Sequence, residues 1–350
     1  MSREVMLGGR MVGDNYRPYI IGEISGNHNG SLDQALEIVR KAAEAGVDAL
    51  KLQTYTADTM TLDLRKGEFL ITDRDSLWHG ESLYDLYKKA STPWEWHRPI
   101  FELARKLGMD AFSTPFDDTA VDFLESLDQP FYKIASFENT DLPLIRKVAK
   151  TGKPVIISTG MATVAEIDEA VATARKAGCK NLILLKCTSN YPAPPEYSNL
   201  ATIPHMREMF DCIIGLSDHT LGIGAAVASV ALGARVIEKH ITLSRDDGGV
   251  DSKFSSEPAE LKMLVEETTR AFSAVGKIAY GPIGTESKSL QFRRSLYAVK
   301  DIEVGEALSA ENVRAIRPGN GLSPKFFDLL TGRRARFAIP RGNPITWENI

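Results

Sequence analysis

The chain has 350 residues, of which 43% are apolar and 25% charged, and its formal net charge is −4. This length exceeds the usual size of a single core, so we expect one large domain and a smaller one. The charge balance argues against nucleic acid or an anionic membrane as a partner. No apolar run approaches the roughly 20 residues of a membrane span.

The N-terminal stretch MSREVMLGGR lacks the apolar region and cleavage site of a secretory signal. Three cysteines, Cys179, Cys187 and Cys212, have no metal-ligand spacing, and the last two lie in apolar, strand-like runs. Buried free thiols in a reducing compartment fit this pattern better than a disulfide. We therefore expect a cytoplasmic protein.

Short β-branched runs alternate with longer amphipathic stretches from residue 19 onward. Strands are predicted at 19–25, 49–55, 110–116, 131–136, 154–160, 182–188, 212–219 and 235–242. Helical spacing is clearest over 32–46, 94–108 and 258–276. Strands that alternate with helices imply a parallel sheet, and eight such units favour an α/β fold of the (β/α)8 TIM-barrel type. The alternative is an open doubly wound sheet, but SGNHNGS after the first strand does not match its GxGxxG turn.

The pattern changes near residue 280. Residues 281–291 contain a Gly/Ser-rich segment, which predicts a linker between a barrel domain (1–280) and a small domain (292–350). The small domain holds a weak repeat, since DIEVGEALSAENV (301–313) resembles AIPRGNPITWENI (338–350). We expect two related half-motifs packed about a pseudo-twofold axis, in a module too small to have a large core of its own.

Two of the six histidines end successive hydrophobic runs. His219 ends the seventh predicted strand and His240 the eighth, so a barrel would place them side by side at its carboxyl-terminal mouth. Two imidazoles with carboxylates nearby suit a divalent cation that keeps open coordination positions. His28, in the turn after the first strand, is expected to order that loop rather than to bind a metal.

Polar groups end the other predicted strands as well: Glu23 and Ser25, Lys51 and Gln53, Thr114, Lys133 and Ser136, Ser158 and Thr159, Thr188 and Ser189. Lys51 and Lys133 interrupt apolar runs, and burying an ammonium group is costly unless an anion compensates. One such lysine could form a structural ion pair. Two lysines with several hydroxyls on one rim predict a site for phosphate and carboxylate.

A long polar segment follows the second predicted strand. LITDRDSLWHGESLYDLYKK, residues 70–89, is far longer than an ordinary connection. We interpret it as a lid that selects a sugar, with a poorly ordered excursion as the alternative.

Several motifs in chain order resemble those of the sialic acid synthases: IIGEISGNHNGS, LKLQT, STPF, KIAS, STGM, GLSDHTLG, VIEKHIT and RPGNG. The resemblance covers essentially the whole chain and implies a (β/α)8 barrel joined to a C-terminal antifreeze-like (SAF) domain. Within the family, YKIASFE, DSKFS and RPGNGLSPKFF look most like pseudaminic acid synthases.

The resemblance implies condensation of phosphoenolpyruvate with an open-chain acylated amino sugar, using water and releasing phosphate. The expected sugar is 2,4-diacetamido-2,4,6-trideoxy-β-L-altropyranose and the product pseudaminic acid. His219 and His240 would hold Mn²⁺ or Mg²⁺. The residues implied to bind phosphoenolpyruvate are Lys51, Thr114, Lys133, Ser136, Ser158, Ser189 and Ser217. Those implied to face the sugar and water are Glu23, Gln53, Tyr191 and Asp251.

The resemblance also implies a domain-swapped homodimer. Arg317, in RPGNG, would reach the N-acyl group of the sugar from the small domain of the other subunit. One departure stands out, because the family's CTNIYP reads CTSNYP here and Ser189 replaces an asparagine.

In physical terms, Glu23 is the predicted base for the water that adds to C2 of phosphoenolpyruvate, with Glu238 in reserve. Lys51 and Lys133 would stabilise the departing phosphate. Three alternatives remain. An aldolase could form an imine on either lysine, the enzyme could make N-acetylneuraminate or legionaminic acid, or the chain could be a non-catalytic carbohydrate-binding protein.

Overall fold

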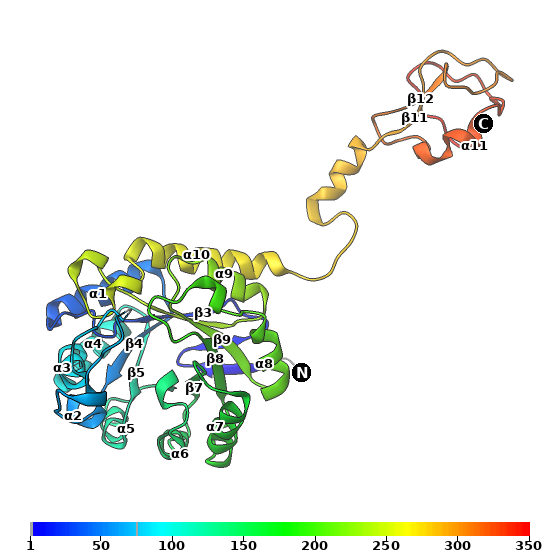
Figure 1. Cartoon of the computed structure of the whole chain (residues 1–350). Helices are drawn as coiled ribbons and strands as arrows, with labels where there is room; N and C mark the ends of the chain where they lie inside the picture. The colour runs from blue at the N-terminus through cyan, green and yellow to red at the C-terminus, as the bar shows by residue number, and fades with distance from the viewer. Residues whose placement is uncertain (1–2, 75) are drawn as a thin grey trace. The chain divides into compact units, whose positions relative to one another are not determined.

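The computed structural model describes residues 3–74 and 76–350 and divides into two compact units, Met1–Gly276 and Lys277–Ile350 (Figure 1). None of the described helices combines the length and apolar character that crossing a membrane requires.

A parallel eight-stranded sheet forms the centre of the first unit. Its strands stand in the order β5-β4-β3-β10-β9-β8-β7-β6, so the last strand returns to pair with the first, and the end strands β5 and β6 contact each other. The strands are β3 (Tyr19–Glu23), β4 (Ala49–Thr54), β5 (Asp110–Pro115), β6 (Tyr132–Ile134), β7 (Val155–Ser158), β8 (Leu182–Cys187), β9 (Ile213–Asp218) and β10 (Val236–His240). The predicted barrel is confirmed, and the open doubly wound sheet is wrong.

Helices follow the strands and surround the barrel (Figure 1). They are α1 (Leu32–Ala45), α4 (Trp94–Lys106), α5 (Asp118–Glu125), α6 (Leu142–Ala149), α7 (Val164–Lys176), α8 (Thr202–Phe210), α9 (Gly224–Ala231) and α10 (Pro258–Val275). In α1, the Ser31 hydroxyl accepts the N–H of Gln34, and Gly46 ends the helix at a φ of 85°. The residues whose spacing predicted this helix, among them Ile38 and Val39, are its buried face.

A β-hairpin precedes the barrel and was not predicted from the sequence. Its strands are β1 (Glu4–Leu7) and β2 (Arg10–Gly13), which pair antiparallel. Leu7 and Val12 are fully buried and pack in one cluster with residues from the barrel interior, including Phe112. The hairpin therefore completes the interior core of the barrel.

The long connection after β4 is ordered. It contains α2 (Ala57–Met60), η1 (Gly67–Phe69) and α3 (Leu83–Ala90). Within it, the indole N–H of Trp78 donates to the carbonyl oxygen of Val250 at 3.1 Å, which ties this segment to the loop after β10. The described part of the predicted lid thus has structure of its own; Asp75, within that range, lies outside the described residues.

The second unit is a small β-rich module. It contains η6 (Gly284–Phe292), β11 (Ser295–Ala298), β12 (Val313–Ile316), η7 (Pro324–Phe326) and α11 (Phe327–Leu330), and β11 pairs antiparallel with β12. The predicted linker, 281–291, falls in its exposed first part.

The internal repeat of this unit is confirmed by equivalent contacts. Ile302 and Ile339, which are matched in the repeat, exchange both backbone hydrogen bonds, at 3.0 and 2.8 Å. The matched side chains of Asn312 and Asn349 each accept a backbone N–H three residues earlier, at 2.8 and 2.9 Å. The two half-motifs therefore have the same local structure and pack against each other.

Candidate active site

A pocket of about 360 Å³ opens where the barrel strands end. The predicted site residues that line it are Glu23, Lys51, Gln53, Lys133, Ser136, Ser158, Tyr191, Ser217, His219, His240 and Asp251. The sheet register brings His240, Glu23 and Lys51 together. His240 on β10 is paired with Glu23 on β3, and Glu23 is paired in turn with Lys51 on β4. Parallel strands that end in polar side chains thus build a single polar rim, as the sequence predicted.

Two buried lysines and two buried glutamates form the floor of the pocket. The ammonium of Lys51 lies 2.9 Å from Glu23 Oε2 and 3.0 Å from Glu238 Oε2. Lys133 lies 3.5 Å from Glu238 Oε1, which also accepts the hydroxyl of Ser217 at 3.0 Å. Every one of these ionic side chains is no more than 3% exposed. Such pairing offsets the cost of desolvating the charges, so removing one partner would leave a buried charge uncompensated.

The pKa shifts follow this arrangement. Burial acts to raise the pKa of both glutamates, but His240, when protonated, and Lys51 lower that of Glu23, and Lys133 and Lys51 lower that of Glu238, so both carboxyls are ionised. Burial acts to lower the pKa of Lys51, and its two carboxylate neighbours outweigh it and raise that pKa. Burial lowers the pKa of Lys133; the nearby carboxylate of Glu238, 3.5 Å away, opposes this effect, and the charge of Lys51 adds to it.

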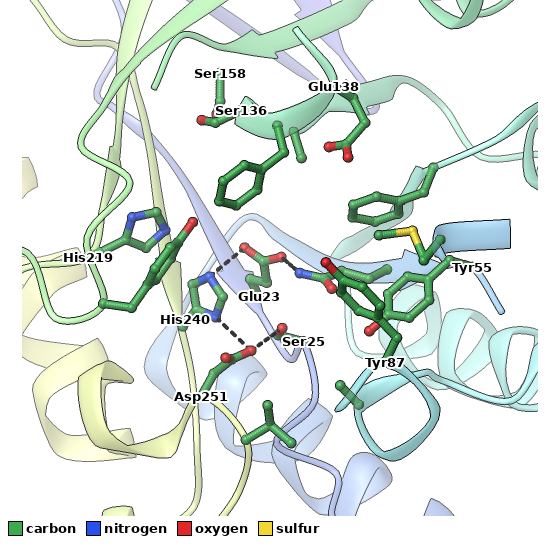
Figure 2. A pocket seen from close by; sticks show the side chains of 18 of the residues that line it. Glu23, Ser25, Tyr55, Tyr87, Ser136, Glu138, Ser158, His219, His240 and Asp251 are labelled. Carbon is green, nitrogen blue, oxygen red and sulfur yellow. Dashed lines mark hydrogen bonds and ion pairs between the residues drawn. The ribbon is translucent and has the colours of Figure 1, made fainter. Parts of the chain in front are cut away.

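The two histidines lie next to each other at the rim, as predicted. Their ring centroids are 5.3 Å apart, and Figure 2 shows both on the same side of the pocket. Nδ1 of His219 lies 3.0 Å from the carbonyl oxygen of Thr188, so Nδ1 carries a proton, and in the neutral ring the lone pair is on Nε2. His240 has carboxylates on both sides, with Nε2 3.1 Å from Glu23 and Nδ1 3.8 Å from Asp251.

These donors are compatible with a divalent cation. Nδ1 of His240 is buried and has no hydrogen-bond partner in the part of the chain that the structure describes. Burial lowers the pKa of this ring, which favours the neutral form that metals bind. Among the described residues, no group of three or more His, Cys, Asp or Glu side chains forms a metal site. The protein would therefore supply two imidazole ligands, His219 and His240, and leave other positions to substrate and water.

Aromatic and polar side chains enclose the histidines. Tyr191 lies 4.6 Å from the His219 ring and Phe254 4.9 Å from the His240 ring, measured between centroids. Asp251 accepts a hydrogen bond from the hydroxyl of Ser25. The carboxamide of Gln53 donates to Glu23 Oε1 at 2.8 Å. The predicted sugar-facing residues Glu23, Gln53, Tyr191 and Asp251 thus lie around one end of the pocket.

A second group of predicted residues lies where β6, β7 and β8 end. The backbone N–H of Gly160 donates to the hydroxyl of Ser136 at 3.1 Å. A side chain at Gly160 would collide with the hydroxyls of Ser189 and Ser136, so only glycine lets them approach this closely. The hydroxyls of Ser158 and Thr114 are buried, and no described residue forms a hydrogen bond with either. Hydroxyls of this kind can bind an anion, although Thr114 and Ser189 do not line the pocket itself.

Two further residues singled out in the sequence are not among those that line this pocket. Arg317 belongs to the second unit, where it is exposed just after β12. His28 does not line the pocket; its Nδ1 accepts the N–H of Gly30 at 3.1 Å, so it orders the turn, as expected. The three cysteines are free and buried, as predicted. Among them, Cys187 lies 3.9 Å from Nδ1 of His219.

Some pocket residues were missed in the sequence. Glu138 ends η2 (Ser136–Glu138), directly after β6, and lines the pocket. Burial raises its pKa to about 7, against the opposing effect of Lys133. Its position two residues after Ser136 was the available signal, since residues just past a strand end face the mouth of a barrel. Tyr55 and Tyr87, which line the pocket, and Phe254, which packs on the His240 ring, were also missed, and no local pattern distinguishes them from core aromatics.

Comparison with known proteins gives the following relationships. The model of the NeuB family matches residues 38–280, and that of the SAF domain matches residues 293–350. Pseudaminic acid synthase of Campylobacter jejuni is 45% identical over 330 residues, which are 93% of this chain and 95% of that protein. The N,N'-diacetyllegionaminic acid synthase of the same species is 38% identical over 320 residues, 90% of this chain and 95% of that protein.

Among solved structures, the N-acetylneuraminic acid synthetase of Leptospira borgpetersenii in complex with citrate superposes with a TM-score of 0.74 and 32% identity. The match covers 84% of this chain and 97% of that one.

Proposed function

The chain belongs to the NeuB family, and from that premise we propose that it is a pseudaminic acid synthase. The reaction is condensation of phosphoenolpyruvate with 2,4-diacetamido-2,4,6-trideoxy-β-L-altropyranose and water, which gives pseudaminic acid and phosphate. The observation that carries the choice of sugar is the higher identity, 45% against 38%, to the pseudaminic acid synthase than to the legionaminic acid synthase of the same species. N-acetylneuraminate and legionaminic acid synthesis are the alternatives within the same chemistry.

Phosphoenolpyruvate would bind over the floor of the pocket. Lys51 and Lys133 are the cations there, and the unpartnered hydroxyl of Ser158 is a free donor for a phosphate or carboxylate oxygen. The ammonium groups are fixed before substrate arrives, because Glu23 and Glu238 hold them in place. A positive charge that needs no reorganisation stabilises the departing phosphate most effectively.

The open-chain sugar would place its aldehyde beside His219 and His240. These residues would hold a Mn²⁺ or Mg²⁺ ion, which when bound would polarise the aldehyde oxygen toward attack by the enol carbon. The carbonyl of Thr188 orients the ring of His219, and Glu23 and Asp251 flank that of His240. Such neighbours fix which ring nitrogen is available as a ligand.

Glu23 is the residue we propose as base for the water that adds to C2. It is ionised and lies between His240 and Gln53, in the middle of the pocket (Figure 2). Glu238 is paired with Lys51, Lys133 and Ser217, whereas Glu23 lies 3.1 Å from His240, beside which the aldehyde would bind, so Glu23 is the preferred base. After water adds, the tetrahedral C2 releases phosphate when its C–O bond breaks.

The contacts of the lysines bear on the imine-forming alternative. An imine needs an unprotonated amine, and Lys51 is held as an ammonium by two carboxylates within 3.0 Å. Borohydride with the substrates present would therefore leave Lys51 unmodified, and labelling of Lys133, whose pKa burial lowers, would favour the imine-forming alternative.

The test of the proposed function is phosphate release from phosphoenolpyruvate with a panel of sugars. We expect kcat/KM for phosphate release to be at least about 100-fold higher with 2,4-diacetamido-2,4,6-trideoxy-β-L-altropyranose than with two other sugars. These are the stereoisomeric precursor of legionaminic acid and N-acetylmannosamine. Mass spectrometry of the product should give the mass of pseudaminic acid. Preference for another sugar would assign the enzyme to that nonulosonate, and no release with any sugar would reject the proposal.

We also propose a cytoplasmic, domain-swapped homodimer in which Arg317 contacts the N-acyl group of the sugar bound by the partner. The exposure of this side chain and the free cysteines of the chain support the two parts of this proposal. Arg317→Ala should raise the KM for the sugar about 10-fold or more and change the KM for phosphoenolpyruvate less than about 3-fold. Arg341→Ala, another exposed arginine of the second unit, is the matched control. An unchanged sugar KM in Arg317→Ala would reject this role.

A further inference from the structure

The pocket has two chemically different halves. One half carries the strand-end lysines, glutamates and histidines described above. The other half, the apolar wall, is formed by Met60, Ile71, Leu83, Leu86, Tyr87 and Phe116. Except for Phe116, these residues all come from the long connection between β4 and α4. A polar enzyme pocket thus continues directly into an apolar surface.

The wall is packed as part of the fold. Tyr55, at the end of β4, is 3% exposed and packs edge-to-face on Phe116 and on Tyr87, with ring centroids 5.1 and 5.9 Å apart. The helix that supplies Leu83 and Leu86, α3, is capped by the hydroxyl of Ser82, which accepts the N–H of the third helical residue. Figure 2 shows Tyr55 and Tyr87 across the pocket from His219 and His240. The apolar wall therefore faces the end of a ligand remote from the reacting aldehyde.

One carboxyl group lies beside this wall. It belongs to Glu138, whose Oε2 atom is buried and has no hydrogen-bond partner among the described residues (Figure 2). The groups near it are Tyr87, Lys133 and Asp141. Burial raises the pKa of Glu138 to about 7, so near neutral pH much of it is the uncharged acid, which can donate a hydrogen bond.

We propose that the apolar wall and Glu138 form a specificity subsite for the deoxygenated, acylated end of the sugar. The wall takes up methyl groups, and the carboxyl group of Glu138 donates a hydrogen bond to an amide carbonyl oxygen. This inference rests on the proposed function, since it names the part of that same substrate which the subsite recognises. A trideoxy diacetamido sugar offers a methyl group at C6 and an acetamido group at C4, where a hexose offers hydroxyls.

The selectivity has a simple physical basis. Moving a methyl group from water to an apolar surface is favourable, because it lowers the free energy of the system. Hydroxyls placed against the same surface lose their hydrogen bonds to water, and the described wall provides few partners to replace them. A site built in this way discriminates by roughly 100-fold or more between substrates that differ in such groups.

The test compares kcat/KM for the trideoxy diacetamido sugar and for N-acetylmannosamine in variants of the wall. Leu83→Asn puts an amide on the apolar wall, and we expect it to lower kcat/KM for the trideoxy sugar about 10-fold or more. The ratio of this kcat/KM to that for N-acetylmannosamine should fall as well. Leu62→Asn is the matched control, because Leu62 belongs to the same connection but is 62% exposed and does not line the pocket. The KM for phosphoenolpyruvate and the melting temperature are measured alongside.

Glu138 is tested by two substitutions. Glu138→Leu removes the donor, and we expect it to lower kcat/KM for the trideoxy sugar about 10- to 100-fold, with the KM for phosphoenolpyruvate changed by less than about 3-fold. Glu138→Gln keeps an N–H donor and should lose less activity than Glu138→Leu.

The outcomes separate the two proposals. If the wild-type enzyme releases no phosphate with any sugar, the proposed function fails. If the wild-type enzyme is active and Leu83→Asn and Glu138→Leu both keep its sugar preference, the subsite inference fails and the proposed function stands. If Leu83→Asn does not fold, Leu83→Ser takes its place, and Glu138→Met takes the place of Glu138→Leu in the same way. The sugar preference of the replacement variant is then compared with that of the wild-type enzyme.

Discussion

His219→Ala and His240→Ala should each lower phosphate release from phosphoenolpyruvate by about 1,000-fold or more. Each substitution removes one of the two imidazoles that the structure places 5.3 Å apart at the rim of the pocket. Loss of the cation that we propose these rings hold would leave the aldehyde a poor electrophile, and electrostatic stabilisation of this kind is often the largest single contribution to catalysis. The measurement is the rate of phosphate release at saturating phosphoenolpyruvate and sugar, with Mn²⁺ present.

The fold should survive both substitutions, because the two rings end strands β9 and β10 rather than fill the barrel core. His205→Ala is the matched control, since His205 lies on α8, away from the lining of the pocket. A variant with wild-type activity after removal of metal by a chelator would contradict the role of the histidines.

Lys239→Met should destabilise the barrel by about 3–5 kcal/mol. The ammonium of Lys239 lies 2.8 Å from Asp218 Oδ2 and 2.6 Å from the carbonyl oxygen of Thr220, and the two charged side chains are only 1% and 2% exposed. Because Lys239 and Asp218 are register partners on β10 and β9, they join these strands one residue before His240 and His219. Removing the lysine leaves a buried carboxylate without its cation.

The destabilisation is measured by urea unfolding, with Lys253→Met as control because Lys253 is exposed. The double variant Asp218→Leu, Lys239→Met should recover most of the loss, since it removes the charge that would otherwise be unpaired. A loss below about 1 kcal/mol in Lys239→Met would show that water or a shifted side chain compensates Asp218.

The eight strands and the position of the two histidines could be predicted because their signals are local. A β-branched run that ends in a polar residue can be recognised from the sequence alone, and in a parallel barrel the carboxyl ends of the strands meet at one rim. The repeat of the second unit was also readable, since Ile302 and Ile339 occupy matched positions and pair with each other.

The hairpin β1–β2 could not be predicted from local sequence signals of this kind. Its strands have four residues each, which is too short for a periodicity to stand out, although Val5, Leu7 and Val12 alternate around the Gly8–Gly9 turn. Its stability comes from packing into the barrel, and that packing partner is distant in the sequence.

The ion pairs at the floor of the pocket also depend on how strands that are distant in the sequence are arranged in the barrel. The sequence showed lysines inside apolar runs and so required an anion, but it could not show that Glu238 of β10 bridges Lys51 of β4 and Lys133 of β6. Likewise, the raised pKa of Glu138 arises from burial by several segments. Such properties exist only once the chain has closed into a barrel.

We propose that His219 and His240 together hold one divalent ion on which the condensation depends. Metal-stripped protein is titrated with Mn²⁺, and bound ion, measured by electron paramagnetic resonance, is compared with the rate of phosphate release in the same samples. We expect both to rise together and to level off at one ion per chain, with no such rise in either alanine variant. Full phosphate release from the stripped protein, or equal Mn²⁺ binding by the variants, would contradict the account.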